Sequence, residues 1–127
     1  MEQLTLKAEM TVLTEMMKSK FYATAIPVSD VETFKSKLVQ IKKDNPKAKH
    51  VVYAYRIGNS SKSCDDGEPK GTGGRPILEF LTKKNLSNVA IIVVRYFGGV
   101  QLGASRLLRT YLNSAINVVN QCEVINY

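Results

Sequence analysis

The apolar positions of this chain change their spacing several times, and each spacing predicts a different element. Residues 8–17 and 20–26 are rich in β-compatible side chains, which predicts two strands, or one long bent strand, ending at Pro27. Residues 51–57 alternate between two faces and predict a further strand. Residues 89–97 are apolar on both faces, which is typical of a central strand covered on both sides.

A helix is expected between Pro27 and Pro46. Ser29 and Glu32 have the spacing of a capping box, in which each side chain bonds the other residue's backbone amide. Spacings of three and four then mark one apolar face, formed by Val31, Phe34, Leu38 and Ile41. The helix must end before Pro46, because a proline disfavours helical backbone in the residue before it.

Two more helices follow glycine-rich segments. Pro76 fits the first turn of the earlier one, which should stop near Asn85. The later and longer one should open at Ala104 and present a broad apolar stripe. Residues 62–65 predict a short partner strand, and residues 122–127 are either a last edge strand or disordered.

Strands and helices in this order predict one α+β domain over residues 1–127, with about three helices packed on a mixed β-sheet. The 127 residues suffice for a core without metal or disulfide staples. Cys64 and Cys122 are expected to be reduced, and with a single histidine, His50, a structural zinc site is not expected. His50 lies at a strand start, where a packing or hydrogen-bonding role is the more frequent one.

The net charge of the chain indicates which class of partner it can bind. The net charge is +7, and a folded basic surface attracts polyanions such as RNA, DNA, ribosomes or an acidic protein. The longest apolar run, Val89 to Val94, is too short to cross a bilayer, and the first ten residues mix acids with apolar residues, unlike a signal peptide. We therefore expect a cytoplasmic protein without a membrane partner.

Seven of the eight glycines lie between Asp65 and Leu112, in two clusters that each run into a predicted helix. Lys70 to Arg75 combines glycines, a hydroxyl and two cations, and Gly98 to Ser105 leads towards Arg106 and Arg109. Free amides at such helix starts can bind a phosphate. Three interpretations stay open: tight turns that are purely architectural, contact with a phosphate backbone or nucleotide, and contact with a protein.

Two further features have chemical alternatives. Asp65, Asp66 and Glu68 can supply oxygen ligands to Mg²⁺ beside a phosphate, although acids around an Asp-Gly pair are also ordinary turn chemistry. Tyr96, near the end of its strand, is the aromatic residue best placed to stack on an unpaired base. Tyr53 and Tyr55 alternate with small residues, so burial under a helix is expected for them.

The segments CDDGEPKGTGGRP and VVRYFGGVQLGASRLLRTY, together with KSKF near residue 20 and His50 before YAY, resemble the Impact N-terminal-like family, also called the YigZ family. The resemblance spans roughly residues 18–115. It implies a fold like domain 2 of ribosomal protein S-five, which is shared with ribonuclease PH, elongation factor G domain IV and the GHMP kinases. Cys64 departs from the family pattern, in which serine is common there.

In eukaryotic relatives, the resemblance implies a regulator of translation that competes for an activator of a starvation-responsive kinase. Bacterial relatives look like translation-associated or nucleic-acid-binding proteins. Bacterial relatives usually carry a second, ferredoxin-like domain and eukaryotic ones an RWD domain, and we expect neither in this chain.

These observations predict a non-enzymatic, translation-linked binding module that contacts RNA, the ribosome or a translation regulatory protein through loops 65–75 and 95–103. The alternative is an enzyme acting on a nucleotide or phosphorylated small molecule with an acidic metal site. For the first hypothesis no catalytic residue, metal or cofactor is expected, and the oligomeric state is open. The candidate binding residues are Asp65, Asp66, Gly67, Glu68, Lys70, Gly71, Thr72, Gly73, Gly74, Arg75, Arg95, Tyr96, Gly98, Gly99, Gly103, Arg106 and Arg109.

Overall fold

A computed structural model describes residues 3–127, so the first two residues of the predicted domain lie outside the described residues. Five strands form the main sheet in the order β2-β3-β6-β4-β5, and each ladder in it is antiparallel. Their bounds are β2 Met10–Met16, β3 Ser19–Pro27, β4 His50–Ile57, β5 Ser60–Cys64 and β6 Val89–Tyr96.

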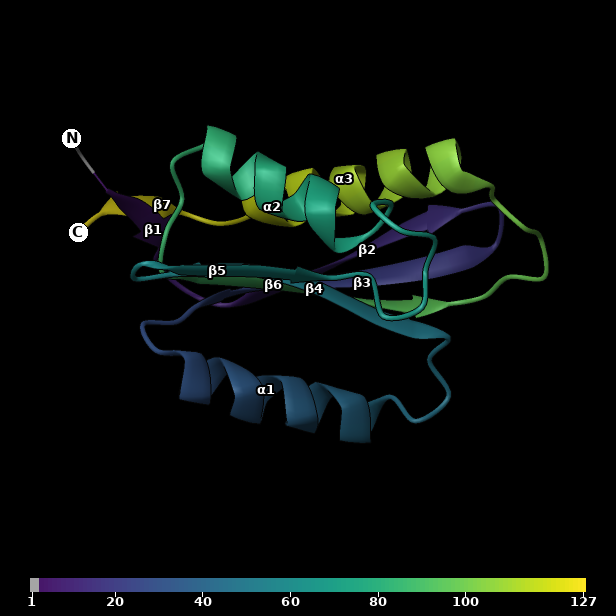
Figure 1. Cartoon of the computed structure of the whole chain (residues 1–127), viewed down its shortest axis with the longest axis horizontal. Helices are drawn as coiled ribbons and strands as arrows, with labels where there is room; N and C mark the ends of the chain where they lie inside the picture. Colours follow the sequence, from purple (N-terminus) through teal and green to yellow (C-terminus); the bar gives the residue numbers. More distant parts are fainter. Residues whose placement is uncertain (1–2) are drawn as a thin grey trace.

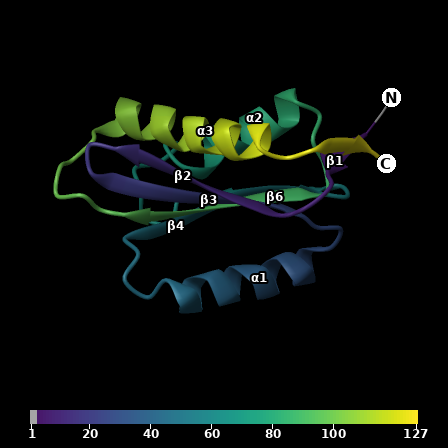
Figure 2. The same cartoon turned by 180° about the vertical axis from the view of Figure 1, so that it is seen from behind.

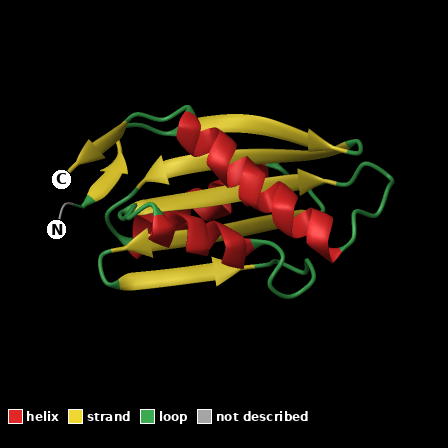
Figure 3. Ribbon diagram, turned by 90° about the horizontal axis from the view of Figure 1, so that it is seen from above, coloured by secondary structure: helices red, strands yellow, loops and turns green. Residues whose placement is uncertain are grey.

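Three helices cover the two faces of this sheet (Figure 1). Helix α1 (Val31–Asp44) lies on one face, and α2 (Gly74–Lys83) and α3 (Ala104–Asn120) lie on the other, which Figure 3 shows from above. The predicted α+β class with three helices is confirmed. The expected mixed sheet is refined to an antiparallel one, since the parallel pairing is an isolated bridge between Leu4 and Leu86.

The central strand β6 is buried on both faces, as its continuous apolar run predicts. On the α1 face, Phe34 packs against Tyr53 and Tyr55, with ring centroids 5.1 and 4.8 Å away, so the predicted burial of these tyrosines is confirmed. On the other face, Phe21 and Tyr111 meet edge to face at 5.1 Å. Each face of the sheet therefore has its own apolar core.

The start of α1 differs from its predicted capping box. Asp30, rather than Ser29, is the N-cap residue, and its carboxylate accepts from the backbone amide of Thr33 at 2.8 Å. Serine and aspartate are both favourable N-cap residues, so the sequence placed the helix start one residue too early. The helix ends at Asp44, before Pro46, as predicted.

The tail forms a strand. The segments β1 (Leu4–Leu6), which the sequence pattern missed, and β7 (Val124–Asn126) pair into a small separate sheet beside the two ends of the chain (Figure 2). In residues 3–127, every helix is too short or too polar to cross a membrane.

Candidate functional site

The first glycine loop, residues 65–74, is closed by a side chain of its own. The Asp65 carboxylate accepts from the backbone amides of Gly71, Gly73 and Gly74 at 2.9, 3.0 and 3.0 Å. Gly74 also packs so closely on the sheet that an added Cβ would lie 2.6 Å from the Cys64 nitrogen and from the Tyr53 oxygen. These three amides are therefore satisfied within the protein by Asp65.

The three acids of the predicted metal site point to different partners. Asp65 caps α2, while Asp66 accepts from the Val51 amide at 2.7 Å. Glu68 is buried, 7% exposed, in an ion pair described below. Within residues 3–127 no group of three or more His, Cys, Asp or Glu side chains is arranged to hold a metal ion. The alternative hypothesis of an acidic metal site therefore has no geometric basis in this region.

Glu68 is the centre of a buried polar cluster, which we call the Glu68 cluster and which consists of Glu68, Arg95, His50 and Tyr111. Arg95 Nη1 donates to both carboxylate oxygens, at 2.9 and 2.7 Å. His50 Nε2 lies 3.3 Å from Oε1, and the Tyr111 hydroxyl donates to Oε2. The cluster joins the first glycine loop to β4, β6 and α3.

Strand register explains how this cluster assembles. His50 and Arg95 are directly opposite each other on β4 and β6, so their side chains share one face of the sheet. Phe21 is opposite Arg95 on β3, and the guanidinium carbon lies 5.4 Å from its ring centroid. Arg95 was expected to be a charge on the rim of the site. It is instead 4% exposed, because the inward face of β6 carries it under α3.

The hydrogen-bond directions assign protons within the Glu68 cluster. His50 Nδ1 lies 2.6 Å from the Asp66 carbonyl oxygen, which can only accept, and Nε2 faces the Glu68 carboxylate. An oxygen atom therefore faces each ring nitrogen of His50. Burial, together with the bond to Glu68, raises the pKa of Tyr111, which keeps its hydroxyl a donor. The Glu68 carboxylate is thus paired with the Arg95 cation and accepts from the Tyr111 hydroxyl.

A cavity of about 370 Å³ lies against the Glu68 cluster and the second glycine loop. It is lined by Lys49, His50, Glu68, Pro69, Arg95, Phe97, Gln101, Leu102, Gly103, Ala104 and Leu107. Helix α3 begins here, and its N-cap residue, Gly103, has a φ of 78° and offers no side-chain cap. Arg95 Nε is buried and, within residues 3–127, has no hydrogen-bond partner.

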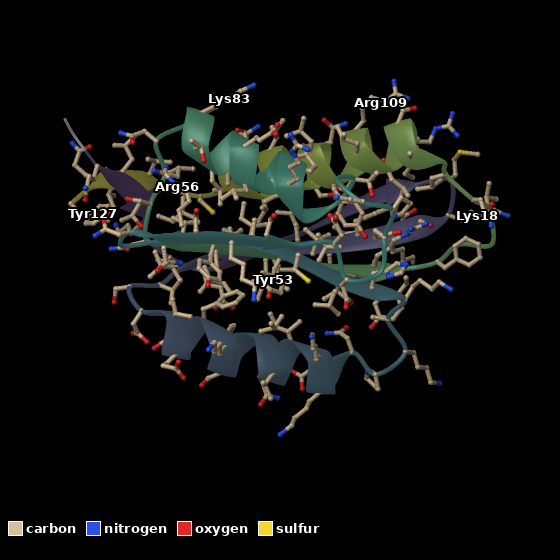
Figure 4. The ribbon with its side chains drawn as sticks, viewed as in Figure 1. Lys18, Tyr53, Arg56, Lys83, Arg109 and Tyr127 are labelled. Atoms are coloured by element: carbon tan, nitrogen blue, oxygen red, sulfur yellow. The ribbon has the colours of Figure 1, made fainter. Side chains whose placement is uncertain are left out.

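Two residues of the cavity lining, Lys49 and Phe97, lie at an end of the molecule that carries further cations. Phe97 is 47% exposed, and Lys49 Nζ lies 6.0 Å from its ring centroid. Arg106 Nη1 lies 2.7 Å from the Met17 sulfur, which places the β2–β3 turn beside α3. Figure 4 shows Lys18 and Arg109 at this same end of the molecule. We call this surface, formed by Lys18, Lys49, Phe97, Arg106 and Arg109, the α3-end surface.

The remaining candidates lie apart from the cavity or have structural partners. Arg75 pairs with Glu79 at 3.1 Å on the exposed side of α2. Tyr96 is partly buried, donating to Asn45 Oδ1 at 2.5 Å. The Thr72 hydroxyl donates to the Pro69 carbonyl at 2.6 Å. Among the remaining candidate glycines, Gly67 and Gly99 have a positive φ. Lys70 is exposed.

The candidate residues named from the sequence included neither His50 and Tyr111 of the Glu68 cluster nor Lys18 and Lys49 of the α3-end surface. Tyr111 was placed on the apolar stripe of α3, where it indeed packs. A usable signal was present in the sequence: Arg95 stands in an otherwise apolar strand and Tyr111 in an apolar helical stripe. Two buried polar groups need a hydrogen-bond partner, so together they indicate a buried polar site. The partner, Glu68, is 27 positions from Arg95 and 43 from Tyr111.

The comparisons with known proteins agree on one family. The protein family described as "Impact N-terminal domain" matches residues 17–119 of this chain. The chain is 40% identical over 111 residues to "IMPACT family member YvyE" of Bacillus subtilis, covering 85% of this chain and 51% of that protein. It is 34% identical over 109 residues to "IMPACT family member YigZ" of Escherichia coli, covering 82% and 53%.

Two solved structures are similar as well. One, described as a hypothetical protein, superposes with a TM-score of 0.94 at 28% identity, covering 99% of this chain and 64% of that one. The other, the "two-domain translational regulator Yih1", gives a TM-score of 0.51 at 28% identity, covering 95% and 47%. The chain spans about half the length of the curated bacterial relatives given above.

Proposed function

The chain belongs to the Impact N-terminal domain family, and on that premise we propose that it is a translation-linked binding module that contacts RNA phosphates through the α3-end surface. Its similarity to Yih1, which is described as a translational regulator, supports the link to translation. The net charge of +7 supports a polyanionic partner.

The observation that carries this proposal is the concentration of cations at the α3-end surface. Arg106 and Arg109 are three residues apart on α3, so they lie on neighbouring positions of one helix face. Within residues 3–127, no acidic side chain forms an ion pair with Lys18, Arg106 or Arg109. Cations without acidic partners are available to phosphate groups.

Phe97 adds a second component to this surface. An exposed aromatic ring next to a lysine suits an unpaired base, which can stack on the ring while its phosphate meets the cation. Such contacts give affinity with little sequence readout. Single-stranded RNA is therefore the form of nucleic acid that this surface suits best.

The test is RNA binding as a function of salt, measured by fluorescence anisotropy with a labelled single-stranded RNA. We expect affinity to fall steeply between about 50 and 200 mM salt, with a slope of about −0.7 per neutralised phosphate. Arg106→Glu combined with Arg109→Glu should weaken binding and flatten that slope, with an unchanged circular dichroism spectrum.

The matched control reverses two charges on the opposite face of the sheet. Lys42 and Lys43 lie in the last turn of α1, so Lys42→Glu combined with Lys43→Glu changes net charge equally, away from the α3-end surface. Binding should weaken much less in this variant. Absence of binding at low salt, or equal losses in the two double variants, would refute RNA contact at this surface and leave a protein partner as the explanation for the family's role.

A further inference from the structure

We propose that the cavity beside the Glu68 cluster binds a nucleoside phosphate monoester, with the phosphate at the start of α3. The chemistry is shared by a free mononucleotide and by the 5′-phosphate end of an RNA strand. This inference goes beyond the proposed function, because the cavity can take a mononucleotide whether or not the α3-end surface binds RNA.

The start of α3 is the first support. The first four amides of a helix have no partner within it, and they carry the positive end of the helix dipole. The other two helices satisfy theirs with Asp30 and Asp65, whereas α3 has a glycine N-cap and no side-chain acceptor. Gly103 and Ala104 both line the cavity, so this helix start opens into it.

Arg95 supplies an independent observation. It is more than nine-tenths buried, lines the cavity, and leaves Nε without a hydrogen-bond partner in residues 3–127. A buried donor without an acceptor is costly, and such groups usually mark an absent water, ion or ligand. A residue with an unpartnered donor and an uncapped helix start therefore line the same cavity.

The charge around the cavity also favours an anion. Glu68 uses both carboxylate oxygens on Arg95, His50 and Tyr111, and its side chain is 2% exposed, so it presents no free acceptor surface to a ligand. Arg95 balances this one negative charge, and Lys49 adds a second cation to the lining of the cavity. A phosphate monoester, with up to two negative charges, matches this excess.

The size and lining of the cavity extend the ligand beyond a bare phosphate. A volume of about 370 Å³ lies within the range of small-molecule sites and far exceeds one phosphate group. Phe97 can stack on a base, and Gln101 can donate to and accept from its polar edge. A nucleoside attached to the phosphate suits this volume and these two side chains.

The test is calorimetric titration with adenosine 5′-monophosphate, adenosine and inorganic phosphate. Adenosine 5′-monophosphate should bind at one site, with the other two at least about tenfold weaker, a difference of 1.4 kcal/mol at 25 °C. Amide resonances of residues 103–106 should shift on binding. No binding of the mononucleotide at millimolar concentration, or equally tight binding of inorganic phosphate, would overturn the proposal.

A substitution pair separates ligand binding from folding. Ala104→Asp places a carboxylate on a residue that lines the cavity, whereas Ser105→Asp places it one residue further on, outside the lining. Both acids lie in the first turn, where they stabilise the helix, so neither should lower the melting temperature. Ala104→Asp should weaken the mononucleotide at least about tenfold and Ser105→Asp far less. Equal effects of the two would contradict the proposed phosphate position.

Two short oligonucleotides, one 5′-phosphorylated and one 5′-hydroxylated, distinguish the sources of the phosphate. Preference for the phosphorylated strand assigns an RNA end, and binding of the mononucleotide alone assigns a free nucleotide. If RNA binds through Arg106 and Arg109 while neither monoester binds, the cavity proposal fails and the proposed function stands. If the mononucleotide binds and RNA does not, the proposed function fails alone.

Discussion

The two glycine-rich loops look alike in sequence but have opposite chemistry. Each precedes a helix and each has glycines with a positive φ, Gly67 and Gly71 in one and Gly99 and Gly103 in the other. The first loop places its own carboxylate, from Asp65, on the amides at the start of α2. The second loop supplies no such side chain, and its helix starts at a cavity. A glycine-rich helix start can therefore accept a ligand only where the chain's own side chains do not occupy its amides.

The Glu68–Arg95 ion pair connects the first loop to β6, the strand that leads into the second loop, and its loss should be the most destabilising change. Arg95→Met would leave Glu68 buried with one cation fewer, at a cost of about 3–5 kcal/mol in the free energy of unfolding. Urea denaturation measures this. The matched control is Arg75→Met, which removes an exposed pair with Glu79 and should cost less than about 1 kcal/mol. Similar losses in both variants would show that burial of the Glu68 cluster has no energetic role.

Removal of the Asp65 carboxylate should leave the start of α2 without a side-chain acceptor, as the start of α3 already is. Asp65→Ala leaves the Gly71, Gly73 and Gly74 amides without their acceptor and should lower the unfolding free energy by about 2–3 kcal/mol. Asp65→Asn keeps one acceptor oxygen and should cost less. Sulfate should then raise the melting temperature of Asp65→Ala more than that of the parent, because it can occupy the vacated amides. A variant as stable as the parent would refute the role of Asp65 as a cap.

Close packing fixes the second loop at its first glycine. A Cβ on Gly98 would lie 2.1 Å from the Lys18 carbonyl carbon and 2.4 Å from the Ser19 nitrogen, which forces the backbones apart. Gly98→Ala should therefore cost about 2 kcal/mol, measured by thermal unfolding. At Gly99 the space is open and only the φ of 92° is unfavourable, so Gly99→Ala should cost about 1 kcal/mol. The reverse order would mean that backbone angle, and not packing, positions this loop.

Local patterns explain why so much of the fold could be predicted from the sequence. The strand over 89–96 and the helix from Ala104 follow from spacings within a few residues, and the structure confirms both. The sequence also placed both glycine loops at helix starts. These features depend on residues that are neighbours along the chain, so the spacing of apolar and polar residues predicts them directly.

The differences arise where partners are distant along the chain. Asp65 accepts from amides six to nine positions away, so no local motif distinguishes its cap from a metal ligand. Arg95 was expected at the surface, as one of the charges of the candidate binding site. Its inward position depends on the strand register with His50 and on a carboxylate that arrives from another loop. Sequence spacing alone carries no information on either.

Helix α1 is the reference for a helix start that is capped by a neighbouring residue. The pH dependence of the stability contributed by this cap should be the smallest of the expected effects. Hydrogen bonds from the Thr33 backbone amide and hydroxyl lower the pKa of Asp30 from its ordinary value of 3.8. A lowered pKa in the folded state means that the stabilisation is present above pH 3.8 and is lost as pH falls through the folded-state pKa. Asp30→Ala should therefore be less stable than the parent at about pH 7, with the difference shrinking at lower pH. Asp30→Asn keeps a neutral cap and should show no such shrinkage. Thermal unfolding of the three proteins across this range measures the effect, and a parent–alanine difference independent of pH would contradict a charged cap.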